Sequence, residues 1–376
     1  MKRRTLGISL LICFVLTAGI YCKKSGGDDG PDNNVNFDKT AMLTYFADEM
    51  ILPSYKSLQD KVNNFQTISN NFLGTRNTAN QQLLLDAYKQ MHLAYTHVEA
   101  YNLGPAVVSS QEVFLNFNGG LDYKFATSGE ITGFSVDSVT IENNITSGSY
   151  DFNQYVRNSF YAQGFSAINY LFFGPNAIAK FTNNTANRIK YCKDVVSRIK
   201  SIVDKITTDW NAYRADFISN TKTNVGSPIG NMINNMAYEM DLLKGPRTGW
   251  PFGKQSNGQA FPTKVEAYFA GNSSALAQEA MKNLKNIFTA NGSGKGYSDY
   301  LKALGKEALA TQVISQFDLV IAKLQAVPDP LSTTIIADPT KVEDAYKEIQ
   351  KLLTLLKTDV ASATGVQITF MDNDGD

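Results

Sequence analysis

Apolar side chains recur along most of this chain at alternating steps of three and four residues, which places them on one face of an α-helix. The longest unbroken example is a seam of the kind that helix bundles and coiled coils bury. Its members are Ile189, Cys192, Val196, Ile199, Val203, Ile206, Trp210, Tyr213 and Phe217. The pattern predicts a bundle helix here, with the Cys192 thiol buried as a small hydrophobe.

The same spacing predicts most of the other elements. Helices are expected at 37–68, 77–101, 227–244, 264–270, 273–289, 305–327 and 341–363. Pro53 is expected to kink or break the first, because proline removes a helical hydrogen bond and clashes with the preceding turn. One more helix is expected from a cap at Asp151 to the stop signal Gly174-Pro175. The number of expected helices suits an all-α fold of two four-helix-bundle-like domains packed together.

Two stretches interrupt the helical pattern. Residues 115–150 are rich in Gly, Asn, Ser and Thr, and 131–141 alternates enough to permit a short β-hairpin, so we expect an irregular or hairpin insertion there. The polar run 220–224 marks the expected domain boundary. It divides the chain into an N-terminal bundle at 36–222 and a C-terminal bundle at 223–376.

The first residues predict export. Three basic residues precede an apolar run that ends at Cys22, so residues 1–21 are interpreted as a signal peptide, too short for a transmembrane helix. Cys22 is expected to be the lipidated first residue of the mature protein, although Tyr21 is bulky for such a cleavage site. Residues 22–35 are a polar, flexible tether. The prediction is a lipoprotein of the cell envelope, anchored to the outer membrane and facing the periplasm or the surface. The alternative is a secreted protein with a chance cysteine.

Charge and cysteine content exclude some functions. Loss of residues 1–21 leaves 32 basic and 35 acidic residues, a net charge of −3. No basic cluster is present, so nucleic acid is not an expected partner. Cys13 leaves with the signal peptide and Cys22 carries lipid, which leaves Cys192 alone and no intrachain disulfide in the mature protein.

One short motif carries a resemblance. Gly164-Phe165-Ser166-Ala167-Ile168-Asn169, followed by an apolar run and Phe173-Gly174, resembles the signature of the imelysin-like family, Gly-x-His-x-x-Glu followed by an apolar run and Phe-Gly. In that family the His and Glu are the proposed metal-binding or catalytic pair. Here Ser166 and Asn169 stand in their places, on one face of what should be the last turns of a helix.

Other segments match the family in the expected order. The stretch 95–105, which contains Glu99 and ends in Gly-Pro, is similar to a first-bundle segment, and 264–270, with Glu266, is similar to a second-bundle segment. The tail, with Asp372, Asp374 and Asp376, resembles the family's terminal Asp-Gly-Asp. The resemblance implies the two-bundle fold and a role in iron or haem acquisition. Family members are also described as peptidases.

With Ser166 and Asn169 in place of the His and Glu of the motif, the remaining metal hypothesis is a site made of oxygen ligands only. If the family arrangement holds, Glu99, Asn169 and Glu266 gather with the terminal aspartates, Asp374 among them, where the bundles meet. Carboxylates and amides favour hard cations such as Ca²⁺ or Fe³⁺, so iron or another hard cation is the expected cofactor, if any. The alternative is that Ser166 and Asn169 only hydrogen-bond to fill the space of the missing pair.

Catalysis has less support from the residues. His92 and His97 are five residues apart on different helix faces, so we expect local hydrogen bonds from both and no shared metal. Ser166 has no base near it in sequence. The loop carrying Arg247 and Trp250 is a candidate cleft for an anionic or aromatic ligand. The favoured function is a binding protein linked to iron, haem or a protein partner. The alternatives are an imelysin-type metallopeptidase and a partner-binding surface scaffold.

Overall fold

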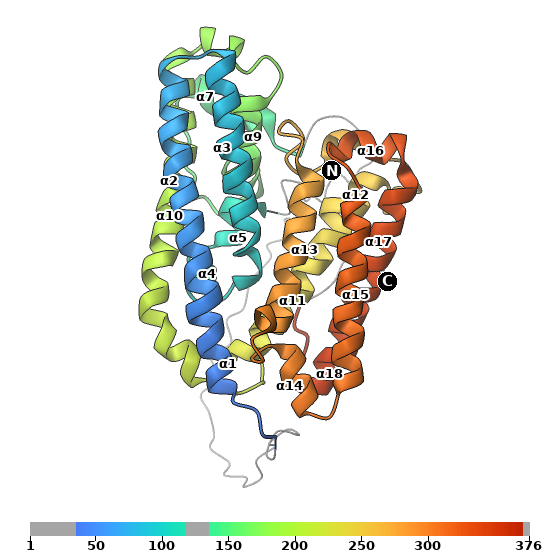
Figure 1. Cartoon of the computed structure of the whole chain (residues 1–376). Helices are drawn as coiled ribbons and strands as arrows, with labels where there is room; N and C mark the ends of the chain where they lie inside the picture. Colours follow the sequence, from blue (N-terminus) through green and yellow to red (C-terminus); the bar gives the residue numbers. More distant parts are fainter. Residues whose placement is uncertain (1–34, 118–134, 371–376) are drawn as a thin grey trace, which may run out of the picture. The chain divides into compact units, whose positions relative to one another are not determined.

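The computed structural model describes residues 35–117 and 135–370, and all of these belong to one compact unit. In this described part the regular elements are helices and no β-strand is present, which confirms the all-α prediction. None of its helices combines the length and the apolar character needed to cross a membrane. The long helices form two neighbouring groups (Figure 1).

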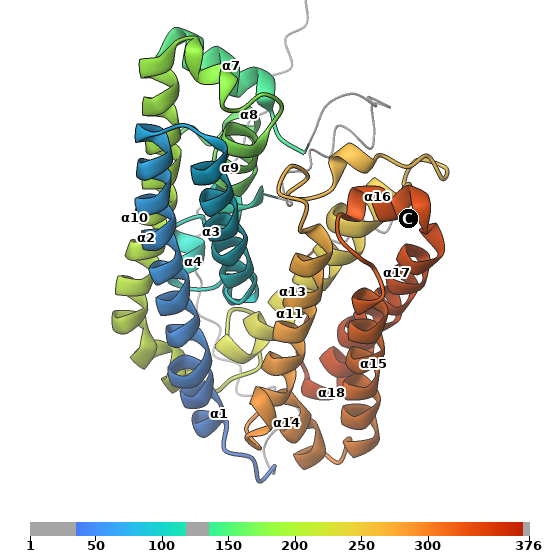
Figure 2. The same ribbon diagram turned by 45° about the horizontal axis from the view of Figure 1, so that its top comes forward.

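The first group is built on three long helices. They are α2 (Leu52–Gly74), α3 (Thr78–Thr96) and α10 (Thr185–Ser219). Its shorter helices among the described residues are α1 (Lys39–Tyr45), α4 (Pro105–Val108), α5 (Gln111–Leu115), α7 (Ser138–Ser147), α8 (Arg157–Phe160) and α9 (Gly164–Phe173). Asn77 caps α3 by accepting a hydrogen bond of 2.8 Å from the Asn80 backbone N–H. In Figure 2, α7, α8 and α9 lie together at one end of this group, beside α10.

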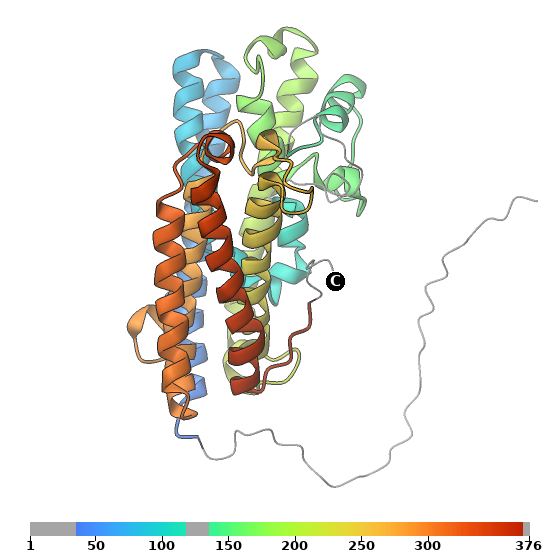
Figure 3. The same cartoon turned by 90° about the vertical axis from the view of Figure 1, so that its right-hand side faces the viewer.

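The second group runs alongside the first (Figure 3), and in the described part of the chain it has four long helices. They are α11 (Pro228–Lys244), α13 (Ser273–Thr289), α15 (Glu307–Gln325) and α17 (Pro339–Thr354). The shorter members are α12 (Trp250–Phe252), α14 (Tyr297–Ala303), α16 (Leu331–Ala337) and α18 (Ala361–Thr364). The prediction of two bundle-like groups is confirmed. The domain boundary near residue 222 stays a prediction; α10 ends and α11 begins on either side of it.

Pro53 does not break its helix. The chain passes from α1 through a π-helical turn, η1 (Phe46–Ile51), directly into α2, and Pro53 lies at the first turn of α2. A π-turn is wider than an α-turn, so it accommodates a residue that has no N–H and whose ring needs space. The helical run therefore continues past Pro53, and the predicted break is absent.

The predicted seam on α10 is buried nearly throughout. Cys192 has no exposed surface, and burial raises the pKa of its thiol to about 12. A thiol with so high a pKa has almost no thiolate at neutral pH, which agrees with the interpretation of Cys192 as a core residue.

Two predictions for the middle of the chain were wrong. Residues 138–147, placed in an irregular or hairpin insertion, form α7, because Asp137 accepts a hydrogen bond from the Thr140 N–H and buried Ile141 and Ile145 lie one turn apart. The rest of the proposed hairpin, 118–134, lies outside the described residues. The helix with the altered motif begins at Gly164, not at a cap on Asp151, so Ser166 lies in its first turn and Asn169 in its middle.

Candidate functional site

The centre of the candidate site is the guanidinium of Arg247, which is 4% exposed. It donates two hydrogen bonds to the carboxylate of Glu99, Nη1 to Oε2 at 2.9 Å and Nη2 to Oε1 at 2.6 Å. Arg247 belongs to the second helix group and Glu99 to the first, where it opens a 3₁₀ turn, η2 (Glu99–Tyr101). This two-point pairing is the strongest geometry available to an arginine and a carboxylate, and it joins the two groups.

Two further carboxylates face the same guanidinium. Glu266 Oε2 lies 3.6 Å from Nε of Arg247, and Glu239 Oε2 lies 3.8 Å from its Nη2. Both glutamates are buried, Glu239 on α11 and Glu266 in the segment before α13. Three carboxyl groups therefore surround one cation inside the protein.

Asn116 and His92 complete the cluster. The Asn116 amide donates to Glu266 Oε1 at 2.7 Å and to Glu99 Oε1 at 3.2 Å, so it bridges two of the acids. His92, on α3, places Nε2 3.3 Å from Glu266 Oε1 and stacks its ring on Phe165 with centroids 4.5 Å apart. We call these six residues the acidic cluster: His92, Glu99, Asn116, Glu239, Arg247 and Glu266.

A distorted turn delivers Arg247 to this position. After Lys244 the chain continues α11 as a π-helical turn, η5 (Gly245–Gly249), and such insertions are frequent at functional sites. The turn requires Gly249, since a Cβ there would lie 2.6 Å from the Lys244 carbonyl oxygen and 2.7 Å from the ring of Tyr346. The Gly-Pro-rich sequence predicted a loop at this place, and the structure instead has a continuous helical path.

Glu266 lies in a turn and not in a helix, so the predicted helix at 264–270 was wrong. Hydrogen bonds from distant residues replace those of a helix. Asn169 Oδ1 accepts from the Ala270 N–H at 2.9 Å, and Ser135 donates to the Val265 carbonyl at 2.8 Å. Ala267 has φ +49°, a left-handed conformation that would interrupt any α-helix. These bonds fix the backbone on both sides of Glu266.

The altered motif therefore supports the cluster and contributes no charge to it. Asn169 is buried and holds the Glu266 segment through Ala270, while Phe165, four residues earlier, supports the His92 ring. Ser166 donates to the carbonyl of Gln163 at 3.4 Å, a bond within its own turn. These contacts agree with the expectation that Ser166 and Asn169 fill polar space.

Burial and neighbouring charges separate the pKa values of the acids. Burial favours the neutral form of Glu266, but Arg247 and then His92 outweigh it, so the pKa of Glu266 is lowered to about 2. Burial, reinforced by the negative charge of Glu99, raises the pKa of Glu239 well above its ordinary value. Burial alone would lower the pKa of the Arg247 guanidinium. The negative charges of Glu266 and Glu99 outweigh this effect and raise the pKa well above its ordinary value, so Arg247 stays charged.

We expect Glu239→Gln and Glu266→Gln to have opposite effects on stability at neutral pH. A carboxyl with a raised folded-state pKa holds a proton that the unfolded chain has lost, so Glu239 makes stability fall as pH rises above about 4.5. Glutamine cannot ionise, so the Glu239→Gln variant lacks this fall and is the more stable protein at pH 7. Glu266 has a lowered pKa, so its contribution is present above about 4.5 and is lost as pH falls toward 2.

Urea unfolding of both variants between about pH 3 and pH 8 tests this expectation. Glu266→Gln should lower the free energy of unfolding at pH 7, and the difference from the parent protein should shrink as the pH falls below about 4.5. A Glu239→Gln variant that is less stable than the parent at pH 7 would show that Glu239 is ionised in the folded state.

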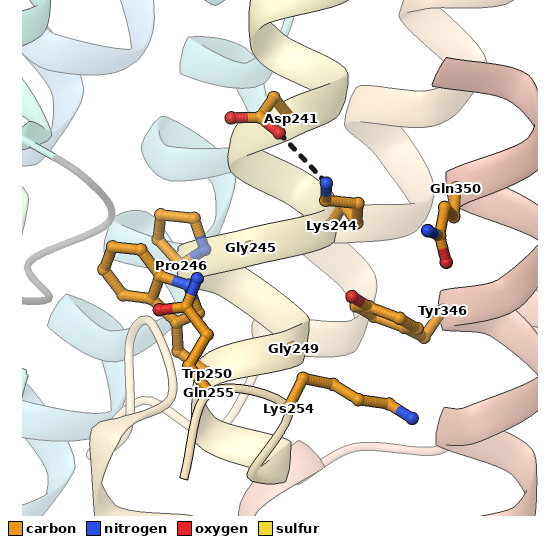
Figure 4. A pocket seen from close by; sticks show the side chains of 10 residues that line it. All are labelled: Asp241, Lys244, Gly245, Pro246, Gly249, Trp250, Lys254, Gln255, Tyr346 and Gln350. Atoms are coloured by element: carbon orange, nitrogen blue, oxygen red, sulfur yellow. Dashed lines mark ion pairs between the residues drawn. The ribbon is translucent and has the colours of Figure 1, made fainter. Parts of the chain in front are cut away.

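The remaining sequence-predicted residues are elsewhere. His97 pairs with Glu279 of α13, Nε2 to Oε1 at 2.9 Å. The expectation that both histidines bond locally was wrong, because each faces a carboxyl from the other helix group. Trp250 lines a separate pocket between the end of α11 and α17 (Figure 4). Asp374 and the lipidation residue Cys22 lie outside the described residues.

The acidic cluster does not fit a bare metal ion in this arrangement. Among the described residues, no three His, Cys, Asp or Glu side chains are placed to hold one. The physical reason is the guanidinium: Arg247 occupies the position among Glu99, Glu239 and Glu266 where a cation would lie. Glu99 and Glu266, two members of the oxygen-only site expected from the sequence, are paired with Arg247. The terminal aspartates of that site lie outside the described residues, so the site itself stays a prediction.

Sequence reasoning missed Asn116 and Glu239. Asn116 stands in the polar stretch 115–150, where nothing in the spacing separates it from its neighbours. Glu239 could have been recognised from its position. It lies on α11, a helix buried on nearly every side, and a buried carboxyl group needs a partner. For His92 the sequence predicted only local hydrogen bonds.

Comparison with known proteins identifies the family. The family model described as Imelysin matches residues 51–360. The chain belongs to the imelysin family. The motif segment, Glu99, Arg247 and Glu266 all lie inside the matched range. A comparison with curated proteins finds no match.

Two solved structures share the fold. An imelysin-like protein from Psychrobacter arcticum 273-4 has 18% sequence identity and a TM-score of 0.68, over 89% of this chain and 99% of that one. A protein from Parabacteroides distasonis ATCC 8503, named "putative iron-regulated protein A precursor", has 17% identity and a TM-score of 0.70, over 87% and 95%. At this identity the likeness concerns the fold.

Proposed function

We propose that this imelysin-family protein is an exported, lipid-anchored binding protein of the cell envelope that takes part in the acquisition of iron or haem. The basic start, the apolar run and Cys22 support export and anchoring. The iron connection is supported by the name of the Parabacteroides relative, which includes the words "iron-regulated" and "precursor".

The observation that carries binding over catalysis is the burial of the acidic cluster together with the pairing of Glu99 and Glu266. Glu99 and Glu266 are paired with Arg247, and Glu266 also faces His92. A hydrolase needs a base or nucleophile that substrate and water can reach. The cluster members are at most 5% exposed, and Ser166 bonds to its own helix turn. This arrangement favours a structural role for the cluster.

The same observation bears on the form of the iron. With Arg247 among the carboxylates, a bare ion would have to displace a buried guanidinium that Glu99 binds at two points. Such a displacement is costly, because the guanidinium would be left without its counter-charges. Iron in a complexed form, such as haem, does not need these carboxylates as ligands. We therefore propose haem or another iron complex as the cargo.

Titration of the purified protein with haem, Fe³⁺, Fe²⁺, Zn²⁺ and Ca²⁺ tests the proposal. Haem is expected to bind, with a shift of its absorption bands, and the bare ions are not expected to bind tightly. Glu266→Gln should leave haem binding unchanged if the cluster is not a ligand set. Tight Fe³⁺ binding that Glu266→Gln weakens would show a metal centre instead, and failure of both haem and iron to bind would refute the iron role.

An imelysin-type metallopeptidase is the second candidate, and the His92–Glu266 pair favours it, because a histidine beside a carboxylate is a common element of such sites. Incubation of the same protein with unstructured polypeptides, with and without added Zn²⁺, separates the two. Cleavage that His92→Phe abolishes would establish the peptidase.

A further inference from the structure

The last described residues lie along α11 without forming a helix. After α18 the chain turns and runs beside α11 (Figure 3). Its side chains alternate, as those of an extended chain do. Val366 is buried, Ile368 and Phe370 are partly buried against the core, and the intervening Gln367 and Thr369 are exposed. We call residues 366–370 the strap.

One side chain of α11 holds the strap by its backbone. Nδ2 of the buried Asn234 donates to the Gln367 carbonyl at 2.9 Å, and its Oδ1 accepts from the Thr369 N–H at 2.7 Å. The Thr369 hydroxyl also donates to this oxygen, at 3.2 Å. A side-chain amide offers one acceptor and one donor group, as a backbone peptide unit does. Asn234 therefore docks the strap as the backbone of a neighbouring strand would.

The end of the strap covers a tyrosine. The ring of Phe370 meets that of Tyr238 edge on, with centroids 5.7 Å apart. Tyr238 follows Asn234 by one turn of α11, so the strap tracks one face of this helix. Lys357 Nζ lies 5.7 Å from the centroid of the Phe370 ring and adds a cation–π contact.

Tyr238 links the strap to the acidic cluster. Its hydroxyl donates to Oε1 of Glu112 on α5, and Asn102 donates to Oε2 of the same carboxyl at 3.1 Å. Burial raises the pKa of Glu112, and the charges of Arg247 and Glu99 act on this carboxyl from nearby. Glu112 is more exposed than the six members of the cluster. The Tyr238–Glu112 pair is therefore an edge of the cluster that reaches the surface beside the strap.

The strap is attached less firmly than the helices around it. Within the described part of the chain, the backbone hydrogen bonds of residues 367–370 go to the side chain of Asn234 only. Segments with few buried apolar contacts and exposed backbone hydrogen bonds open at a small fraction of the global free energy of unfolding. Asn234 and Tyr238 both belong to α11, so the strap can leave them while α11 stays folded.

We propose that the strap is a cover that opens independently of the rest of the protein and controls the access of water and small solutes to the Tyr238–Glu112 edge of the acidic cluster. In the closed position Phe370 shields the Tyr238 ring and the carboxyl that this tyrosine binds. In the open position both face solvent. The device acts on the cluster whatever the cargo is, so it does not depend on the proposed iron role.

Carboxyl labelling tests the cover. The purified protein is treated with a water-soluble carbodiimide and an amine, and the labelling rate of Glu112 is followed by mass spectrometry. Phe370→Ala should raise this rate at least about five-fold, because the ring that covers Tyr238 is lost. Gln367→Ala is the matched control, since this side chain of the strap is exposed. Asp216, an exposed carboxyl on α10, is the internal reference and should react equally in all variants.

A second variant separates local opening from a general loss of stability. Asn234→Ala removes the amide that holds the strap and keeps a residue that favours the helix, so it tests the cover even if Phe370→Ala is unstable. It should also raise the labelling of Glu112, with amide hydrogen exchange in α2 unchanged. Unchanged labelling of Glu112 in both variants would overturn the proposal. Faster exchange throughout α2 would do so too, because access would then come from global unfolding.

Discussion

Replacement of Arg247 by methionine is expected to lower the free energy of unfolding by about 3–5 kcal/mol, because it removes one partner of a buried ion pair and leaves the other uncompensated. Methionine keeps much of the side-chain length and removes the charge. Glu99 loses both of its hydrogen bonds from the guanidinium, and Glu266 loses the group that does most to lower its pKa. Urea unfolding at pH 7 measures the change.

Arg214→Met is the matched control. Arg214 also makes a two-point contact with a carboxylate, donating to Asp48 at 2.5 and 2.6 Å, but its side chain is 39% exposed and that of Asp48 is 33% exposed. An ion pair in contact with water contributes little to the free energy of unfolding, so Arg214→Met should lower it much less than Arg247→Met does. A similar loss in the two variants would mean that burial does not determine the contribution of Arg247.

The substitution Gly164→Ala is expected to destabilise the protein by about 3 kcal/mol or more, because two separate costs combine. Gly164 has φ +70°, which L-residues seldom adopt. A Cβ at this position would also lie 2.2 Å from the carbonyl oxygen of Leu115, a backbone atom that cannot rotate away. The motif glycine is therefore the residue that lets α9 begin against the end of α5.

Gly226→Ala separates the two costs. Gly226 has φ +83°, but a Cβ there would meet no atom within 4 Å. Its substitution should cost only the conformational part, roughly 1–2 kcal/mol. Thermal or urea unfolding of both variants gives the comparison, and equal losses would show that the contact with Leu115 relaxes easily.

Periodic burial made much of the fold predictable. The seam on α10 and the bounds of α13 follow from spacing alone, because a bundle helix must bury one face whatever its partners are. The failures occurred where distant residues override local preference. The Glu266 segment has a helical appearance in sequence, but Asn169 and Ser135 hold it in a turn. Hydrogen bonds to distant residues do not affect the spacing of apolar residues, so they cannot be predicted from it.

The candidate site was predictable only in part. Glu99 and Glu266 were placed together through the family resemblance, and the structure brings both to Arg247. Arg247 itself was assigned to a cleft with Trp250, whereas the two side chains line different places. Side chains three residues apart on a regular α-helix share a face, but the π-turn η5 changes the direction in which the side chains point. The spacing of residues in the sequence does not reveal this change.

The bonds that cross between the helix groups have a consequence for folding. Glu99 with Arg247, Asn116 with Glu266, and Asn169 with Ala270 each join a residue before position 222 to one after it. A separated half would hold buried acids, amides or a guanidinium without partners, and each would oppose its folding. We therefore expect the two groups to unfold cooperatively, as one unit. A chain cut in the polar run 220–224 should keep its halves associated, because each completes the interior of the other.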